Sequence, residues 1–516
     1  MSRTTSSASS VASKSNEEEA QPASNGVVRD EEAAIPQGEK QLQAGEENRY
    51  LVKFKENDPT NPRDWKFAYK VWITIQLGFL ALAASTASSI IGPAGNTIAE
   101  YASVSREVSV LSVSLYILGF GFGPLCWAPI SEIWGRRWSI LPAFFILGLF
   151  SIGTAVSKNA ASIFLTRFFA GLFGSAPVSN VSAALGDIWD PKVRGSAINF
   201  YGIMVVGGPT IGPVIGSALL VNPSLGWRWT EYITAIWVFA TFALTVFCLP
   251  EVYSPVILKW KAQAMRKETG NDAYFHPHEQ MKLDANSILT KHLSRPLRML
   301  FTEPMVTCIA FYASFVYGIL YLTIEVFPIV FEENRGFAPV VGSLPFLGLL
   351  VGIILFGTTI NLANEPRYRR ISLAAKGRPV PEARLPPMIA GSLIFPTGLF
   401  WFGWTAGPEY HWAIPTVAAM FIGGGFNLIF QQCINFLIDT YGLYAASAVS
   451  ANTFLRSLMA AGLPLAAQPM FHNLGVGPAS SILGAVAVAA IPAPLIFWRY
   501  GLALRKRSKF APVLED

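Results

Sequence analysis

The chain has 516 residues, of which 52% are hydrophobic and only 14% are charged. Soluble domains carry about 25% charged residues, so this composition excludes an ordinary soluble protein. The formal net charge is +6, but the basic residues gather in a few segments between long apolar stretches. That distribution is typical of a membrane protein and argues against a nucleic-acid partner.

Long apolar stretches follow one another from about residue 69 to residue 500. A helix needs about 20 apolar residues to cross a membrane, whereas barrel strands run about 10 residues and alternate. The sequence therefore predicts an all-α membrane protein. Twelve transmembrane helices are expected, at 69–91, 107–128, 138–156, 160–182, 196–220, 230–249, 305–330, 339–362, 385–405, 411–438, 442–468 and 479–500.

The basic residues predict the orientation of these spans. The loops on one side hold only four of the 39 Lys and Arg residues, namely Arg106, Lys158, Arg228 and Arg335. Nearly all the others lie in the termini and in the loops on the opposite side. Because segments rich in Lys and Arg stay in the cytoplasm, both termini are predicted to be cytoplasmic.

A long hydrophilic segment divides the spans into two sets of six. The predicted organisation is a disordered N-terminal tail at 1–66, a six-helix half at 67–249, a cytoplasmic central loop at 250–304, a second six-helix half at 305–500 and a basic tail at 501–516. Two such halves are typical of transporters built from parallel repeats. Glu365 with Arg369 and Arg370 echoes, in the equivalent loop, the spacing of Glu132 with the two arginines that follow it.

Three motifs occur in order along the first half. They read Ala128-Pro-Ile-Ser-Glu132-Ile-Trp-Gly135-Arg136-Arg137 between spans 2 and 3, Arg167-Phe-Phe-Ala-Gly171-Leu-Phe-Gly174 in span 4, and Gly202-x4-Gly207-Gly208-Pro209-x2-Gly212-Pro213 in span 5. With these motifs, residues 61–500 resemble the major facilitator superfamily, and specifically its fungal twelve-span drug:proton antiporters. Within that family the chain resembles exporters of polyamines and of many drugs. Glu132 stands where the family usually has Asp.

The resemblance implies alternating access coupled to protons, with Arg167 in the coupling and the Gly-Pro run of span 5 as the antiporter motif. At the cytoplasmic ends of spans 2 to 4, Glu132, Gly135, Arg136, Arg137 and Asp187 form a predicted gate. Acids and bases alternate there, so they can lock helices in one state and release them in another. In the other interpretation, Arg136 and Arg137 only obey the positive-inside rule, which places basic residues on the cytoplasmic side, and they form no gate.

The third motif also predicts a packing seam. Gly208, Gly212 and Gly216 repeat every four residues and lie on one face of the helix, where small residues let backbones approach closely. Pro209 and Pro213 remove hydrogen-bond donors and should bend it. The seam could seal an exchanger against proton leak, or could serve ordinary packing.

Ionisable groups inside spans are costly and usually functional. Two arginines, Arg167 and Arg456, oppose one glutamate, Glu325, which has Tyr317 and Tyr321 on its own helix face. All five are predicted to serve substrate or proton coupling. Glu325 could instead extend to the outer membrane interface.

Polar side chains in spans 10 and 11 extend this candidate site. Asn427, Gln431 and Asn435 are spaced by four, and Asn452 lies one turn before Arg456. Such a stripe should face protein or water rather than lipid. Hydrogen bonds that merely hold helices together are the alternative interpretation.

These features favour a proton-coupled exporter of a small organic acid, secondary metabolite or drug, which neutralises Glu325 or Asp187 with a proton. Alternatives are a polyamine exporter, a proton-coupled uptake symporter and a non-transporting sensor or scaffold. No nucleophile with its base, phosphate loop or metal-ligand set is found, so no enzyme, cofactor or metal is expected. The expected partners are the substrate, protons and the lipid bilayer. We predict a monomer in the plasma membrane, with the vacuolar membrane as the alternative.

Overall fold

The structure is a computed structural model that describes residues 50–280, 294–375, 379–506, 508 and 510. From Val52 onward these residues form one compact unit. Its regular elements are helices, as the apolar stretches predict, and the described part contains no β-strand element. Of the predicted disordered tail at 1–66, residues 1–49 lie outside the described residues. Residues 50–66 are ordered, which corrects the prediction: they contain the 3-10 helix η1 (Pro62–Asp64), and Asp58 forms an ion pair with Lys261.

Six long helices form the first group. They are α2 (Phe67–Ser89), α5 (Leu111–Trp134), α6 (Arg136–Ala155), α7 (Ala160–Ile188), α8 (Pro191–Leu220) and α9 (Arg228–Cys248). Two short helices, α3 (Gly95–Ala102) and α4 (Arg106–Ser109), connect α2 to α5. Asn159 and Ser162 make a capping box that fixes where α7 begins.

The second group contains α13 (Pro304–Phe327), α14 (Pro339–Ser343), α15 (Pro345–Gly352), α16 (Thr359–Ala374), α17 (Leu385–Trp404), α18 (Ala413–Tyr441), α19 (Ala445–Gly462), α20 (Ala467–Leu474), α21 (Val476–Ala489) and α22 (Pro492–Lys506). The π-helical segments η5 (Pro328–Glu333) and η6 (Ile353–Thr358) continue α13 and join α15 to α16. Between the groups lie α10 (Ser254–Thr269), η3 (Pro277–Gln280) and α12 (Ser294–Thr302), so the central loop is partly helical.

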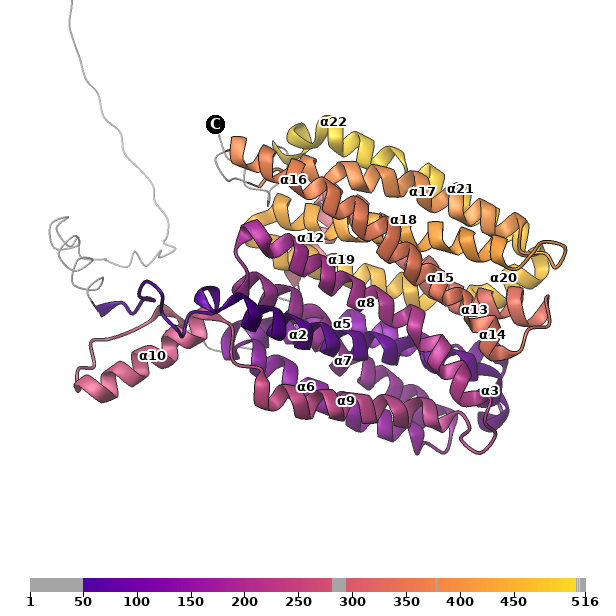
Figure 1. The fold of residues 1–516 in the computed structure, drawn as a ribbon, viewed down its shortest axis with the longest axis horizontal. Coiled ribbons are helices and arrows are strands. Elements are labelled where there is room, and N and C mark those ends of the chain that lie inside the picture. Colours follow the sequence, from indigo (N-terminus) through magenta and orange to yellow (C-terminus); the bar gives the residue numbers. More distant parts are fainter. Residues whose placement is uncertain (1–49, 281–293, 376–378, 507, 509, 511–516) are drawn as a thin grey trace, which may run out of the picture. The chain divides into compact units, whose positions relative to one another are not determined.

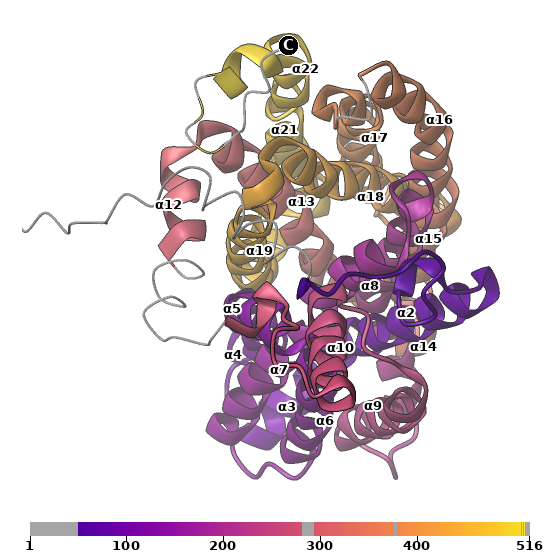
Figure 2. The ribbon, with the colours of Figure 1, turned by 90° about the vertical axis from the view of Figure 1, so that its left-hand side faces the viewer.

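The long helices run side by side, with the first group in indigo to magenta and the second in orange to yellow (Figure 1). The groups meet where α5 packs on α19 and α8 packs on α15 (Figure 2). We call the end with α10, at the left of Figure 1, the signature end. The first of the three sequence motifs ends there with Arg136 and Arg137, which begin α6. The end with α3, α14 and α20 is the far end.

Within the described residues, eleven helices are long and apolar enough to cross a membrane. They match every predicted span except 442–468. There α19 carries Asn452, Thr453 and Arg456, and a 3-10 segment at Leu463–Ala466 separates it from α20. Its polarity and its interruption explain why this helix differs from the others.

The glycines of α8 lie against α2, as their spacing predicts. If Gly208 carried a Cβ, that atom would lie 2.4 Å from Ser85. A Cβ on Gly212 would lie 2.1 Å from the Ser89 hydroxyl, and one on Gly216 would lie 2.1 Å from the Ile90 carbonyl oxygen. Only glycine allows the two backbones to come this close. The helix continues through Pro209 and Pro213 from Pro191 to Leu220.

Candidate functional site

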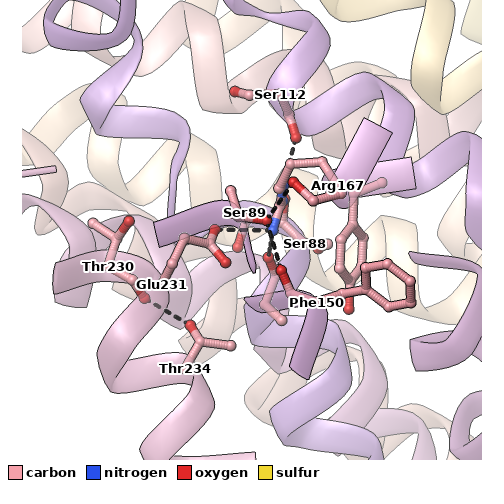
Figure 3. Close-up of polar contacts among 12 residues, drawn as sticks. Ser88, Ser89, Ser112, Phe150, Arg167, Thr230, Glu231 and Thr234 are labelled. Atoms are coloured by element: carbon pink, nitrogen blue, oxygen red, sulfur yellow. Dashed lines mark hydrogen bonds and ion pairs between the residues drawn. The ribbon is translucent and has the colours of Figure 1, made fainter. Parts of the chain in front are cut away.

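Arg167, in α7, is fully buried and holds three other helices (Figure 3). Its guanidinium donates to the carbonyl oxygens of Ser112 on α5 at 2.7 Å and of Ala87 and Ser88 on α2 at 2.8 and 3.0 Å. It also pairs with the carboxylate of Glu231 on α9 at 3.1 Å, and neither side chain of the pair is exposed. The ring of Tyr116 lies 4.4 Å from the guanidinium carbon.

Glu231 overturns the predicted charge balance of the membrane region. It lies in α9 and was not counted, so the expectation of two arginines against one glutamate is wrong. Since each of its three nitrogens already donates to a carbonyl oxygen or a carboxylate and the side chain is fully buried, Arg167 is not free to bind a substrate anion. The geometry gives it a linking role among α2, α5, α7 and α9.

Glu325, in α13, has a partner that crosses between the two groups of helices. Its carboxylate lies 3.0 Å from the guanidinium of Arg106 on α4, and its side chain is 2% exposed. The sequence placed Arg106 in an outer loop, so this pairing was not predicted. Glu325 is therefore buried in an ion pair between the two groups, and its carboxylate is not exposed in this structure.

Two glycines allow close packing around that ion pair. A Cβ at Gly95 would lie 1.4 Å from Nη1 of Arg106, so any side chain there would displace the guanidinium. A Cβ at Gly92 would lie 2.7 Å from Ile324 on α13. One turn before Glu325, the hydroxyl groups of Tyr321 and Ser88 are 2.8 Å apart. These contacts close the far end between the two groups.

Arg456, in α19, differs from the other buried arginines. Its guanidinium carbon lies 4.5 Å from the ring of Tyr317 and 5.0 Å from that of Phe430. Among the described residues, no carboxylate lies within 4.0 Å of it, and its Nε is buried without a hydrogen-bond partner. The side chain is 5% exposed. The two rings stack on each other with centroids 5.6 Å apart, so the guanidinium lies beside the pair of rings. An unneutralised cation in this position can attract an anionic group.

Amide groups near Arg456 also lack partners within the described part of the chain. They are both side-chain atoms of Asn452, which is fully buried, and Nε2 of Gln431. A Cβ at Gly202 on α8 would lie 1.6 Å from that Nε2, so Gln431 reaches from α18 to the first group. Buried polar groups without partners mark places where a ligand or water can bind.

Two other polar residues of α18 bond to segments of their own group. Asn427 donates to the carbonyl oxygen of Ile353 at 3.2 Å, and Gln432 donates to Asn361 at 2.7 Å. Asn435 is half-buried. The structure therefore brings Gln431, rather than the whole stripe, to the interface between the two groups.

At the signature end, Arg136 pairs with Asp187 at 3.0 Å and stacks on the ring of Tyr253 at 4.5 Å. These residues join the start of α6 to the end of α7 and to the segment before α10. Glu132 was expected in this cluster, but within the described residues it forms no ion pair. It lies in the last turn of α5, half-buried.

The acid at the centre of this cluster is Glu251, which the sequence analysis did not select. Its carboxylate accepts the backbone N–H groups of Arg136 at 2.8 Å and Arg137 at 3.1 Å, which begin α6. A carboxylate at a helix N-terminus is favoured by the helix dipole. A Cβ at Gly135, where φ is +100°, would lie 2.3 Å from this carboxylate, so glycine is required there. Burial raises the pKa of Glu251.

The second group has a similar cluster, but the echo Glu365, Arg369 and Arg370 did not identify its arginine. Arg384 pairs with Asp439 at 3.1 Å and Glu365 at 3.5 Å, and it stacks on Tyr368 at 3.4 Å. Arg369 reaches Glu365 only at 3.7 Å and is 45% exposed. Arg384 before α17 and Asp439 in α18 thus correspond to Arg136 and Asp187.

None of these clusters offers a metal site. Among the described residues, no group of three or more His, Cys, Asp or Glu side chains could hold an ion. The site is instead made of buried ion pairs that link helices, one unneutralised arginine and amide groups without partners. This arrangement can bind a polar organic molecule and can change its ion pairs when helices move.

Comparisons with known proteins identify the family. The sequence profile of the Major Facilitator Superfamily matches residues 77–464. The chain is 42% identical over 469 residues to multidrug transporter TPO1_2 of Candida glabrata, covering 90% of this chain and 80% of that protein. It is 39% identical over 488 residues to the efflux pump bik6 of Gibberella fujikuroi, covering 94% and 97%.

Solved structures show the same fold at low sequence identity. A partially occluded, inward-open xylose transporter XylE from E. coli superposes with a TM-score of 0.58 at 16% identity, covering 84% of this chain and 99% of that one. The human organic anion transporter MFSD10 gives 0.57 at 14% identity, with coverage of 83% and 99%. At this identity the likeness concerns the fold alone.

Proposed function

Since the chain belongs to the Major Facilitator Superfamily and is a membrane transporter rather than an enzyme, we propose that it exports a small organic molecule in exchange for protons. The named relatives are a multidrug transporter and an efflux pump, which supports export. The two groups of helices would alternate between opening at the signature end and opening at the far end. The signature end would face the cytoplasm, since the basic segments gather there.

The ion pair between Arg106 and Glu325 carries the proposal of proton coupling. It joins α4 of the first group to α13 of the second, so separation of the two groups at the far end would break it. Opening that end would separate Glu325 from Arg106 and expose the carboxylate to the outer medium, where it can take a proton. Binding of a proton and closure of the far end are therefore linked, and such linkage is reciprocal. Asp187 remains the other candidate acid.

Arg456 carries the proposal for the substrate. It is a cation without a carboxylate partner in the described residues, whereas Glu231 and Glu325 are both paired with arginines. A site of this kind should favour a carboxylate on an aromatic or otherwise planar body, because the stacked rings of Tyr317 and Phe430 lie beside the guanidinium. A polyamine would require free carboxylates at this depth, so a polyamine exporter is the weaker alternative.

Purified protein in liposomes with an acidic interior tests both parts. The probe is radiolabelled para-aminohippurate, an aromatic carboxylate, and spermidine serves for comparison. An exchanger should accumulate the anion in the acidic interior, and a protonophore should abolish accumulation. An uptake symporter would instead drive the anion out of that interior. ATP-dependent transport that ignores the protonophore would refute the proposal.

The same assay separates substrate charge from coupling. Arg456→Gln should raise the para-aminohippurate concentration needed for half-maximal transport, without making spermidine a substrate. Strong transport of spermidine by the unaltered protein, with none of the anion, would show that the site binds polyamines. We expect the protein to be a monomer. We expect it in the plasma membrane, with the vacuolar membrane as the alternative.

A further inference from the structure

A hollow of about 310 Å³ lies at the signature end, outside the ion-pair clusters. It is lined by Ile133 and Trp134 at the end of α5, Trp138 on α6, and Val256, Lys259 and Trp260 on α10. The three tryptophans are exposed by 56%, 58% and 44%. No contact between helices of the described chain explains why three indole rings converge on an open surface.

The position of the tryptophans identifies their surroundings. Trp134 ends α5 and Trp138 lies in the first turn of α6, and both helices are long and apolar enough to cross a membrane. Tryptophan is enriched where the hydrocarbon of a bilayer meets its headgroups, since the ring is apolar and its N–H is a donor. The hollow therefore lies at the level of lipid headgroups.

Helix α10 is held firmly beside these tryptophans. Lys261 forms an ion pair with Asp58, and its hydrogen bond holds the pKa of that carboxyl well below its usual range. Arg266 is paired with Glu279 at 2.6 Å. Nε2 of His278 lies 3.2 Å from the carbonyl oxygen of Ile133, which ties η3 to α5. The wall of the hollow formed by α10 is thus a fixed surface.

Lys259 is the one lining residue that carries a charge. Its neighbours on the helix, Lys261 and Arg266, are neutralised by acids, but among the described residues no carboxylate lies within 4.0 Å of Lys259. A cation beside three aromatic rings at headgroup depth suits a negatively charged headgroup, and each basic residue near such a surface contributes about 1 kcal/mol.

We propose that the hollow binds one anionic phospholipid from the leaflet at the signature end. The headgroup would lie against Lys259, with the indole N–H groups as further donors. The glycerol region and the upper acyl chains would lie on the three tryptophan rings and Val256. The open, aromatic wall favours a lipid over free phosphate, which would gain nothing from these rings.

A lipid at this place would adjoin the cluster of Arg136. Tyr253, whose ring stacks on Arg136, directly precedes α10, and Glu251 lies two residues earlier. The bound lipid would therefore stabilise α10 in the position from which Tyr253 and Glu251 contact the start of α6.

Native mass spectrometry of the full-length, delipidated protein in detergent tests the proposal. The probes are palmitoyl-oleoyl phosphatidylserine and the same chains on phosphatidylcholine. Phosphatidylserine should bind about fivefold more tightly, and Lys259→Gln should remove this preference. Trp260→Ala should weaken both lipids, because it removes part of the apolar wall. Lys267→Gln, exposed on the same helix but outside the hollow, should leave binding unchanged.

Three results would overturn the proposal. Equal affinity for the two lipids would remove the role of Lys259, and equal losses from Lys259→Gln and Lys267→Gln would indicate diffuse attraction to the basic surface. Full competition by inorganic phosphate would assign the hollow to a soluble anion. Thermal midpoints of the variants in detergent must match that of the unaltered protein, and Lys259→Arg should retain the preference.

Discussion

The carboxylate of Glu325 lies 3.0 Å from the guanidinium of Arg106, although 219 positions separate the two residues in the chain. The pair is one of the direct ties between the two groups of helices at the far end, beside the hydroxyl contact of Tyr321 with Ser88. A charge-assisted bond that would break when the two groups separate is a suitable element for coupling protons to movement.

Arg167 and Glu231 should be more important for stability than for binding. Arg167→Ala leaves a buried carboxylate without its cation, which costs about 3–5 kcal/mol. We expect a lower thermal midpoint in detergent and poor expression. Arg167→Met combined with Glu231→Leu should recover much of this loss, because no buried charge remains. If Arg167→Ala matches the unaltered protein in thermal midpoint, the linking role is wrong.

The glycine seam between α8 and α2 predicts unequal effects of alanine on one helix. At Gly216 a Cβ would lie 2.1 Å from a backbone oxygen of Ile90, which cannot move aside. Gly216→Ala should therefore cost about 1–3 kcal/mol. At Gly207 the nearest atom is the end of the Leu350 side chain, at 3.3 Å. Gly207→Ala is the matched control, and equal thermal midpoints for the two variants would contradict the seam.

Arg384, rather than Arg369, should matter in the second group. Arg384→Gln removes bonds to two carboxylates, each worth about 1.5–3 kcal/mol, and should reduce transport strongly. Arg369→Gln, at an exposed position, should transport nearly as the unaltered protein does. Transport rates in liposomes, corrected for protein content, decide between them. If Arg369→Gln reduced transport more than Arg384→Gln, the spacing of Glu365 and Arg369 in the sequence would identify the functional arginine better than the structure does.

Acid should loosen η3 from α5. Burial, with a smaller contribution from nearby Lys259, outweighs the opposing hydrogen bond to Ile133 and holds the pKa of His278 below its ordinary value of 6.5. Burial lowers the pKa of His276 as well. As the pH falls through 6.5, the detached form takes a proton that the packed form does not, so attachment loses free energy on the acid side.

Hydrogen exchange of residues 270–280 at about pH 7.5 and about pH 5.5, corrected for intrinsic rates, measures this loss. His278→Gln keeps a donor for the carbonyl oxygen of Ile133 but cannot titrate, so it should flatten the dependence. A variant that exchanges as the unaltered protein does at both pH values would assign the effect to another group.

The sequence predicted the helical membrane fold because long apolar runs and the placement of Lys and Arg are local signals. It also marked Arg167, Glu325 and Arg456, since charges inside apolar runs are visible without a structure. Their partners were not visible. Glu231 lay inside a predicted span, so a complete count of acids would have found it, but its contact with Arg167 depends on how helices pack.

Two other misses have similar causes. Arg106 was assigned to a loop. It reaches Glu325 only because α4 packs against Gly95, the first residue of α3, where no side chain blocks the guanidinium. The echo of Glu365 with Arg369 relied on spacing along one segment, whereas Arg384 reaches the acids Glu365 and Asp439 from the start of another helix. Local spacing carries no information on such tertiary pairs.

The most direct test of the account replaces Glu325 with Gln and compares two modes of transport in the same liposomes. Gln keeps the size of the side chain and a hydrogen-bond acceptor for Arg106 but cannot bind and release a proton. Accumulation of para-aminohippurate driven by an acidic interior should be lost, whereas exchange of labelled for unlabelled anion at equal pH should persist. Gradient-driven accumulation by Glu325→Gln at the rate of the unaltered protein would contradict the assignment of proton coupling to this residue.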